Sequence, residues 1–360
     1  MNYKMKYSSA VIAAGVLLGG LGFNGQAADS KPAASPKAAV SAQQAAAKTE
    51  VALEWNGKTL SQTGLLDHGT VYVPATAVRD ALGIPLKYNA KSKVYTLGQG
   101  YNILNATVYS AKEIVLTVNG YYAGEPAGRI VNGRLYIPYK VLNQYMGIQG
   151  KWSPSAKQLS MTAKKKNPIT ITTQTLKKDF SNVTASVDYP VISGLKNTEV
   201  QAKINDVLKK NAEFVISSAE KSASELPPSG NNYPYEFEGD YVVQYNANGL
   251  LSITAHDFSY TGGAHGMSYR NSFTFSLEDG EQKQLGDFIN MQGKSKQKLN
   301  NHVLKKLKQE GGYIGEFKGV PADAQFYLKD NAAVLYFQLY EYTAYAYGFP
   351  EFELNLKEWK

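Results

Sequence analysis

The six residues Gly69–Pro74, GTVYVP, recur later in the chain at Gly133–Pro138 as GRLYIP. The two copies are offset by 64 positions, and the same offset relates Gly83 to Gly147 further along. A constant offset over this many positions indicates a tandem structural repeat rather than a chance similarity. We therefore expect residues 51–163 to form one domain built from two copies of a single unit.

Each copy contains the signals of a small α+β unit. An Asn-Gly pair, beginning at Asn56 in the first copy and at Asn119 in the second, predicts a tight hairpin turn because both residue types tolerate a positive φ. The proline that ends each strand stands where a helix can begin, since its missing N–H would be unbonded there. Apolar residues then recur at helical spacing, and a glycine follows where a left-handed cap is wanted. A strand carrying Tyr88 or Trp152 closes each unit.

The pattern Asn-Gly, then G-x-x-Y-[VI]-P, then L-G or M-G, then K-[YW] covers about 110 residues. It resembles the copper amine oxidase N-terminal-like domain of Gram-positive exported proteins. The resemblance implies a stalk-like or wall-associated module and no oxidase. The amine oxidases need three histidine ligands and an Asn-Tyr-Asp/Glu cofactor site, whereas this half has only His68 and the tripeptide is absent. We expect no cofactor and no bound metal.

The first 28 residues predict a signal peptide. Lys4 and Lys6 precede the apolar run Ala10–Phe23, and Gln26-Ala27-Ala28 supplies small residues for cleavage. The run is shorter than the roughly 20 residues that span a bilayer, which favours cleavage over retention as an anchor. Residues 29–50 predict a disordered linker of small and polar residues. The absence of cysteine agrees with an exported bacterial protein and excludes a catalytic thiol.

Charge divides the chain into two halves. Residues 29–166 carry a net charge of +10, and residues 167–360 carry −4. The basic half suits an anionic wall polymer such as teichoic acid, or a membrane surface, and the acidic half suits a cationic partner. The alternative is that both surfaces only maintain solubility. Nothing in the pattern indicates nucleic-acid binding.

Residues 164–168 predict a charged hinge, and residues 169–360 predict a second α+β domain with an antiparallel sheet and two helices. The helices are expected at 197–221 and 295–310, where apolar residues follow helical spacing. Strands are expected at 169–173, 183–191, 241–245, 250–256, 271–277, 281–285, 326–328 and 332–342.

The stretch Asp257–Arg270, DFSYTGGAHGMSYR, breaks a strand pattern with two adjacent glycines. Glycine supplies a positive φ or allows close approach by another backbone. We expect a shaped turn here, next to the aromatic loop Tyr345–Phe349, with a role in recognition rather than catalysis. Tyrosine is enriched at such surfaces because it offers a rigid apolar area with a polar tip.

Six short motifs give the second half a family resemblance. They are Tyr189–Gly194 before the first helix, Tyr260–Gly266, Phe326–Leu328, Tyr336-Phe337, Tyr340–Gly348 and Pro350–Phe352. Their order and spacing resemble the extracytoplasmic domain of lysozyme-sensing anti-sigma factors and of peptidoglycan deacetylases of Firmicutes. The family usually has proline where this chain has Ala344, which implies a softer loop. We find no sigma-binding segment and no deacetylase domain in this sequence, so we expect to carry over neither activity.

The predicted ligand-binding residues come from this glycine turn and the aromatic loop. They are Tyr260, Gly262, Gly263, His265, Glu341, Tyr345 and Tyr347. Zinc binding by His256, Asp257 and His265 is the weaker alternative to a structural role, because a third clear histidine ligand is missing. Alternating Glu236, Glu238 and Asp240 resemble a glycosidase pair in composition only, and a solvated edge strand is the favoured interpretation.

These observations predict a secreted, wall-associated binding protein without enzymatic activity. The resemblance implies that its partner is lysozyme, which is cationic, or a peptidoglycan fragment. Motifs for a nucleophilic serine, a phosphate-binding loop or a zinc protease are absent from the sequence. Two alternatives stay open: a wall-polysaccharide hydrolase or deacetylase using His265, Asp257 and Glu341, and a purely structural wall spacer.

Overall fold

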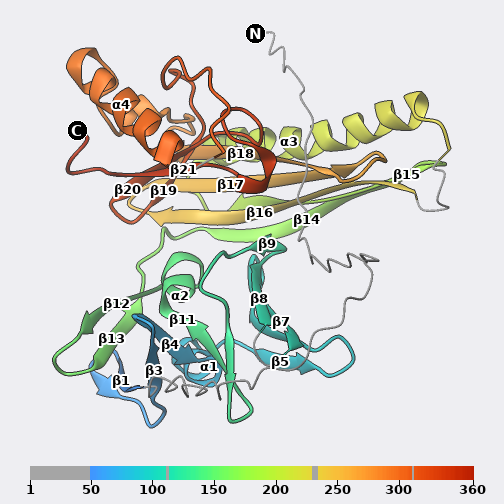
Figure 1. Ribbon diagram of the computed structural model, residues 1–360. Helices are drawn as coiled ribbons and strands as arrows, with labels where there is room; N and C mark the ends of the chain where they lie inside the picture. The colour runs from blue at the N-terminus through green and yellow to red at the C-terminus, as the bar shows by residue number, and fades with distance from the viewer. Residues whose placement is uncertain (1–48, 111–112, 229–233, 310–311) are drawn as a thin grey trace, which may run out of the picture.

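The computed structural model describes residues 49–110, 113–228, 234–309 and 312–360 (Figure 1). The predicted signal peptide and residues 29–48 of the predicted linker lie outside the described residues. The described chain forms an N-terminal body, residues 49–163, and a C-terminal body, residues 169–360, joined by the predicted hinge. Both bodies combine strands with helices, so the predicted α+β class is confirmed.

In its described residues the N-terminal body has two sheets and two short helices, α1 (Ala75–Leu82) and α2 (Tyr139–Tyr145). The larger sheet has the order β10-β11-β4-β3-β1-β13-β12, with β2 paired to β1. Its strands are β1 (Thr49–Trp55), β2 (Lys58–Thr59), β3 (Gly64–Asp67), β4 (Thr70–Pro74), β10 (Arg129–Val131), β11 (Arg134–Pro138), β12 (Ile148–Ser153) and β13 (Gln158–Ala163). The smaller sheet is the meander β5 (Leu86–Asn89), β6 (Val94–Gln99), β7 (Asn102–Ser110), β8 (Glu113–Val118) and β9 (Tyr121–Tyr122).

The two repeats interlock. Strand β4 of the first copy pairs with β11 of the second, with Val73 opposite Ile137, and β1 runs parallel to β13. Pro74 and Pro138 are the residues immediately before α1 and α2, and Gly83 ends α1 with a φ of 64°. The predicted repeat, its strand-proline-helix order and its glycine cap are therefore confirmed.

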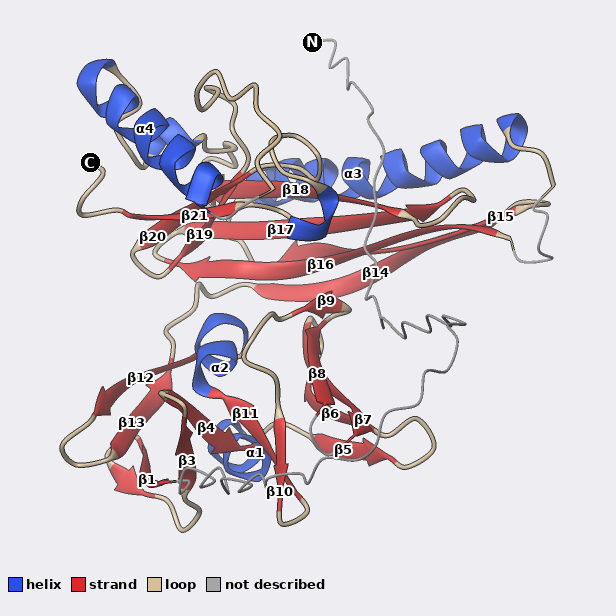
Figure 2. Cartoon of the chain, in the orientation of Figure 1, coloured by secondary structure: helices blue, strands red, loops and turns tan. Residues whose placement is uncertain are grey.

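The described residues of the C-terminal body form a five-stranded sheet, a three-stranded sheet and two α-helices (Figure 2). The larger sheet, in the order of its numbering, consists of β14 (Thr170–Asp179), β15 (Val183–Ser193), β16 (Tyr235–Ala247), β17 (Leu250–Tyr260) and β18 (Met267–Ser276). The smaller sheet consists of β19 (Phe326–Lys329), β20 (Ala332–Tyr336) and β21 (Glu351–Asn355). The helices are α3 (Thr198–Glu225) and α4 (Gly293–Gln309), with short 3-10 helices η1 (Leu285–Asp287) and η2 (Tyr345–Tyr347).

Helix α3 covers one face of the larger sheet. The side chain of Asn197 accepts hydrogen bonds from the backbone N–H groups of Glu199 and Val200, so it satisfies two donors that the first turn leaves free. Ile204 and Leu208 are buried on the face that meets the sheet. No helix among the described residues is long and apolar enough to cross a membrane.

Two predicted strands need correction. Residues 281–285 form a single bridge, Phe275 to Gln282, because the chain then coils into η1. Strand β20 ends at Tyr336 rather than at 342, and Tyr340 has a φ of 61°, which no strand residue adopts. Residues 351–355, where no strand was predicted, form β21 against β20. The larger sheet is also not wholly antiparallel, because β15 and β16 are parallel.

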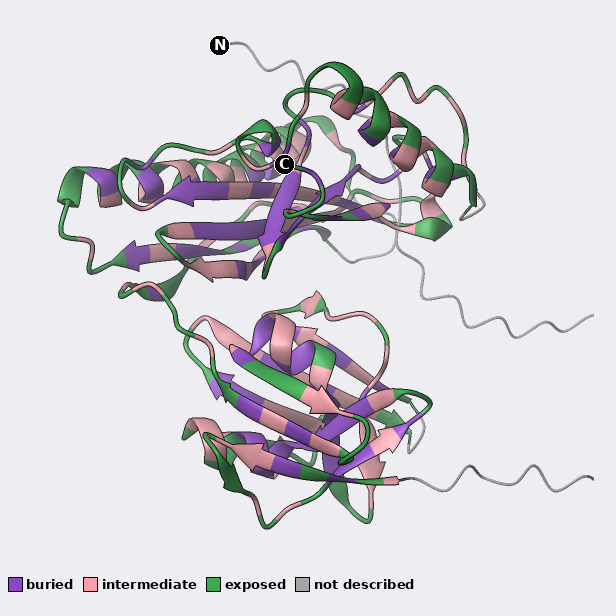
Figure 3. Cartoon of the chain, turned by 90° about the vertical axis from the view of Figure 1, so that its left-hand side faces the viewer, coloured by how far each residue is buried: buried purple, intermediate pink, exposed green. Residues whose placement is uncertain are grey.

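Apolar packing and hydrogen bonds join the two bodies. Val242 of β16 is buried in the core of the N-terminal body, and Asn119 Nδ2 donates to the carbonyl oxygen of Tyr241 at 3.1 Å. In the hinge, Asn167 Nδ2 donates to Asn246 Oδ1 at 2.9 Å and to the carbonyl oxygen of Leu250 at 2.8 Å. Figure 3 shows buried, half-buried and exposed residues along the strands of both bodies. Buried residues mostly alternate with less buried ones in β15, whereas β20 is buried throughout.

Candidate functional site

A row of charged side chains crosses the larger sheet of the C-terminal body. Strand pairing places Asp240 opposite His256 and His256 opposite Arg270, and Asp188 follows Val187, which pairs with Gly239. Residues directly opposite one another point to the same face of a sheet. The row therefore contains Asp188, Asp240, His256 and Arg270, from four adjacent strands.

This row faces away from α3 and toward the N-terminal body. Val187, Tyr241 and Ile253, which alternate with the row along their strands, are buried in the cores under α3. Arg270 Nη2 donates to the hydroxyl of Tyr121 at 2.9 Å, and the ring centroids of His256 and Tyr121 are 4.4 Å apart. A second row two residues further along runs through Ser186, Glu238, Phe258 and Ser268.

The two rows form the floor of a cavity of about 770 Å³, which we call the junction cleft. One wall is the β8–β9 turn, Asn119–Tyr122, which reaches the larger sheet from below in Figure 1. The other wall is the loop formed by Tyr345, Ala346, Gly348 and Phe349. Gly120 approaches Asp240 closely, since a Cβ there would lie 2.6 Å from Asp240 Oδ2. With a φ of 93° as well, this position of the turn requires glycine.

Burial changes the ionisation of the cleft floor. Burial, together with the charges of Asp257, Glu238 and Asp188, raises the pKa of Asp240 to about 8. Burial and the neighbouring Arg270 hold the pKa of His256 well below its usual range. At neutral pH the floor therefore contains a largely protonated carboxyl group beside a neutral imidazole.

Arg270 makes contacts with several elements that line the cleft. Its Nη1 donates to Glu351 Oε1 of β21 at 2.6 Å, and its guanidinium lies 4.1 Å from the centroid of the Phe349 ring. Together with the bond to Tyr121, these contacts join β18, β21, the aromatic loop and the N-terminal body. Such a buried guanidinium is a geometric anchor whose charge is already matched by Glu351.

The cleft collects polar atoms that have no partner. Among the described residues, nine buried side-chain nitrogen or oxygen atoms make no hydrogen bond. Four belong to side chains of the cleft floor or its aromatic wall: Asp240 Oδ1, His256 Nε2, Arg270 Nε and Tyr345 Oη. A fifth, Asp257 Oδ1, lies on the α3 side of the same strands. Buried polar groups are normally hydrogen-bonded, so this concentration points to a place where a ligand supplies the partners.

The structure brings part of the predicted ligand-binding set to this cleft. Tyr345 lines it, and the exposed ring of His265 stacks on Tyr345 with 5.6 Å between centroids. The turn that carries His265 is shaped by Gly262 and Gly263, whose φ values are 91° and 90°. Its predicted position next to the aromatic loop is confirmed.

Other predicted residues lie around the cleft or away from it. Tyr260 donates from its hydroxyl to the carbonyl oxygen of Gly263 at 3.1 Å and so stabilises the turn. Tyr347 is 51% exposed and packs over Gly312. Glu341 accepts a hydrogen bond from the backbone N–H of Gln338 at 3.0 Å and does not line the cleft.

The interpretation of the alternating carboxylates as part of an edge strand is wrong, although Glu236 and Glu238 are exposed to solvent as expected. Strand β16 lies in the middle of the sheet, between β15 and β17, so Glu238 and Asp240 line the cleft. Asp257 points to the α3 side, where its Oδ2 accepts from Asn271 at 3.2 Å, and burial raises its pKa to about 7. Among the residues that the structure describes, no group of three or more histidine or carboxylate side chains is arranged to hold a metal ion.

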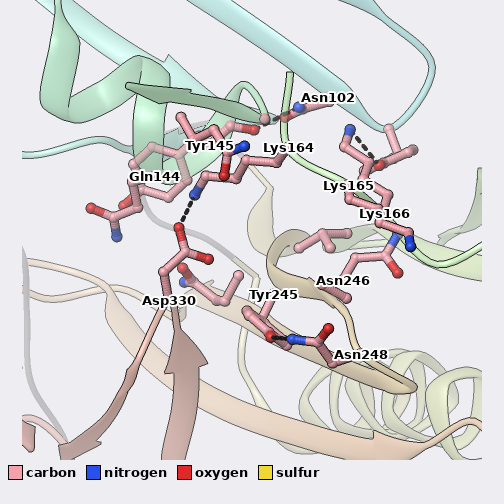
Figure 4. A pocket seen from close by; sticks show the side chains of 16 residues that line it. Asn102, Gln144, Tyr145, Lys164, Lys165, Lys166, Tyr245, Asn246, Asn248 and Asp330 are labelled. Carbon is pink, nitrogen blue, oxygen red and sulfur yellow. Dashed lines mark hydrogen bonds and ion pairs between the residues drawn. The ribbon is translucent and has the colours of Figure 1, made fainter. Parts of the chain in front are cut away.

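A smaller cavity of about 250 Å³ lies at the hinge (Figure 4). Lys164 Nζ pairs with Asp330 at 2.5 Å, and Asn248 Nδ2 donates to the hydroxyl of Tyr245 at 2.8 Å. The Lys164–Asp330 pair joins the hinge to the C-terminal body, and Gln244 Oε1 is the one buried atom without a hydrogen-bond partner among the described residues that line this cavity. This cavity is part of the joint, and the junction cleft is the stronger candidate site.

Family models match three consecutive stretches of the chain. They are the copper amine oxidase N-terminal domain at residues 54–161, Deacetylase PdaC at 176–268, and a protein of unknown function, DUF3298, at 277–357. The cleft takes its turn wall from the first stretch, most of its floor from the second and its aromatic loop from the third.

Among curated proteins, the chain is 25% identical over 178 residues to the peptidoglycan-N-acetylmuramic acid deacetylase PdaC of Bacillus subtilis (strain 168). The match covers 47% of this chain and only 37% of that relative's length.

Two solved structures are also similar: a member of the DUF3298 family from Bacteroides fragilis (18% identity, TM-score 0.42) and a DUF3298 family protein from Pseudomonas aeruginosa PAO1 (14% identity, TM-score 0.41). Each covers 53% of this chain, and the matches cover 91% and 93% of those structures. The resemblance predicted for each half is confirmed: the first half matches the copper amine oxidase N-terminal domain, and the second half matches a PdaC-type domain followed by a DUF3298 domain.

Proposed function

We propose that this chain is an exported cell-envelope protein that binds a peptidoglycan fragment in the junction cleft without chemically changing it. The observation that carries the proposal is the group of unpartnered buried polar atoms of Asp240, His256, Arg270 and Tyr345, which line the cleft. The similarity to the Bacillus subtilis relative, a peptidoglycan-N-acetylmuramic acid deacetylase, supports a wall-derived ligand.

The shape and chemistry of the cleft support a ligand of oligosaccharide size. Its volume of about 770 Å³ lies within the range of small-molecule sites. Polar groups of the floor provide hydrogen-bond partners for hydroxyl and amide groups. The rings of Tyr345 and Phe349 provide apolar faces on which a sugar ring can pack.

The basic N-terminal body gives the protein a second contact with the envelope. Its half of the chain carries the +10 charge, which favours association with an anionic wall polymer. Retention of the protein on purified walls should weaken as salt rises, because salt screens exposed charges. Retention that is indifferent both to salt and to removal of teichoic acid would contradict this part of the proposal.

Because the chain is similar to a deacetylase, an enzymatic function is the second candidate. The three residues proposed for it, His265, Asp257 and Glu341, have different neighbours: Tyr345, Asn271 and Gln338 respectively. This arrangement favours binding over catalysis by that set. Acetate or reducing ends released from peptidoglycan, and lost in His265→Ala at an unchanged melting temperature, would replace the binding proposal with an enzymatic one.

Titration calorimetry of the full chain with defined muropeptides tests the proposal directly. Binding should weaken about tenfold in Tyr345→Ala, because one aromatic contact is lost. Tyr109→Ala is the matched control, since Tyr109 is 64% exposed on β7 and lies outside the cleft. Lysozyme is titrated in parallel as the cationic protein partner predicted from the family resemblance. Heat with lysozyme and none with any muropeptide would overturn the assignment of the ligand.

A further inference from the structure

The cleft floor contains more acidic side chains than basic side chains that could pair with them. Among the described lining residues, Arg270 is the only arginine or lysine, and its Nη1 is already paired with Glu351 at 2.6 Å. Asp188, Glu238 and Asp240 lie on the same face and form no ion pair among the described residues. This floor therefore suits a ligand that brings positive charge.

The surroundings of Asp240 indicate what kind of cation fits. Its Oδ1 is buried without a hydrogen-bond partner. His256, directly opposite Asp240 on the next strand, also has an unpartnered buried atom, Nε2. An ammonium group has three hydrogen-bond donors and no acceptor. It can therefore donate at once to carboxylate oxygens that approach it from different directions. A metal ion would require a cluster of ligands that the described residues do not provide.

The walls indicate what carries the charge. Phe349 and Tyr345 close one side of the cleft and Tyr121 and Tyr122 close the other, so a bound group lies between aromatic rings. Flat ligands with apolar faces and polar edges, such as sugar rings, suit this combination.

We propose that the junction cleft selects a saccharide that carries a free primary amine, with its ammonium group held by Asp240 and supported by Glu238 and Asp188. This inference rests on the proposed binding function and specifies its ligand: an amino sugar from which the acetyl group is missing. An N-acetylated sugar presents a neutral amide at the same position and leaves the carboxylates unpaired.

Proton release follows from this geometry. Several titratable groups lie near Asp240 on the same face of the sheet: Glu238 on its own strand, Asp188 on β15 and His256 on β17. Arg270 on β18 lies next to His256, and Tyr121 approaches from the N-terminal body. The pKa of Asp240, about 8, means that the free protein holds a proton there near neutral pH. A bound ammonium favours the ionised carboxylate, so binding should release that proton.

The test compares two tetrasaccharides that differ only in acetylation. Glucosamine tetramer and N-acetylglucosamine tetramer are titrated into the full chain near pH 6.5, in two buffers of different ionisation enthalpy. We expect the amino form to bind at least tenfold more tightly and to release a proton that the acetylated form does not. Asp240→Asn should reduce the preference about ten- to hundredfold, as expected for loss of a charged hydrogen bond. Glu236→Gln, on the same strand outside the cleft, should leave it unchanged.

The outcomes separate this inference from the proposed function. Equal binding of both tetramers, or an unchanged preference in Asp240→Asn, overturns the amine selectivity and leaves the cleft as a wall-ligand site. Binding of neither tetramer nor any muropeptide overturns the proposed function itself. A short lysine-containing peptide is the third ligand, and binding as tight as that of the amino sugar would overturn the assignment to a saccharide.

Discussion

Replacing Asp240 with asparagine should change how the stability of the protein depends on pH. The carboxyl group is buried with one oxygen unpartnered, and its pKa is about 8 in the folded protein against 3.8 ordinarily. Because the folded pKa is the higher one, the folded state keeps a proton that the unfolded chain has already lost. Stability therefore falls as pH rises from about 4 to about 8, at roughly 1.4 kcal/mol per pH unit.

Asparagine keeps the shape of the side chain and cannot ionise. Relative to the parent protein, Asp240→Asn should gain about 3 kcal/mol in the free energy of unfolding between pH 5 and pH 7. Taking the difference between the two proteins cancels the titrating groups that do not interact with Asp240. Asp257, Glu238 and Asp188 do interact with it, so their coupling to Asp240 is part of the measured difference.

Urea unfolding at pH 5, 6 and 7, with a common slope on denaturant, measures this difference. Glu236→Gln is the control on the same strand, and its curve should run parallel to that of the parent. The reasoning is refuted if the Asp240→Asn difference stays constant, within about 0.5 kcal/mol, over the three pH values.

Three further changes test the fold. Asn197→Ala should cost about 1 kcal/mol in urea unfolding because α3 loses its N-cap, and no loss would mean that the cap is dispensable. Gly120→Val should push the two bodies apart, because the new Cβ would collide with the carboxyl group of Asp240. Trypsin should then cleave the hinge at Lys164–Lys166 faster than in the parent protein, and an unchanged cleavage rate would contradict this. Phe352→Ala should cost about 3–5 kcal/mol because the ring is fully buried, and a cost below 1 kcal/mol would contradict close packing there.

The repeat could be predicted from sequence because its signals are local. An Asn-Gly turn, a proline before a helix and a glycine after it each act within a few residues, and all occur twice, the proline and the glycine at the same offset of 64. The pairing of β1 with β13 could not be predicted in the same way, since it joins residues more than 100 positions apart. Nothing in either strand alone specifies its partner.

The candidate site was predictable only in part for the same reason. His265 and Tyr345 stood out as unusual local sequence, and the structure stacks them. Asp188 and Arg270 look ordinary in the sequence and become part of a site only through strand register. The carboxylates of β16 were noticed, but their place in the sheet depends on β15, whose pairing with β16 spans the whole of α3.

The position of Val242 has a consequence for the protein under heat. This residue belongs to β16 of the C-terminal body, yet it is 1% exposed within the core of the N-terminal body. Neither body can melt alone without exposing apolar surface of the other. Calorimetry should therefore show one cooperative transition with equal calorimetric and van't Hoff enthalpies. The boundary read in the sequence at residues 164–168 separates two folds, but it does not separate two melting units.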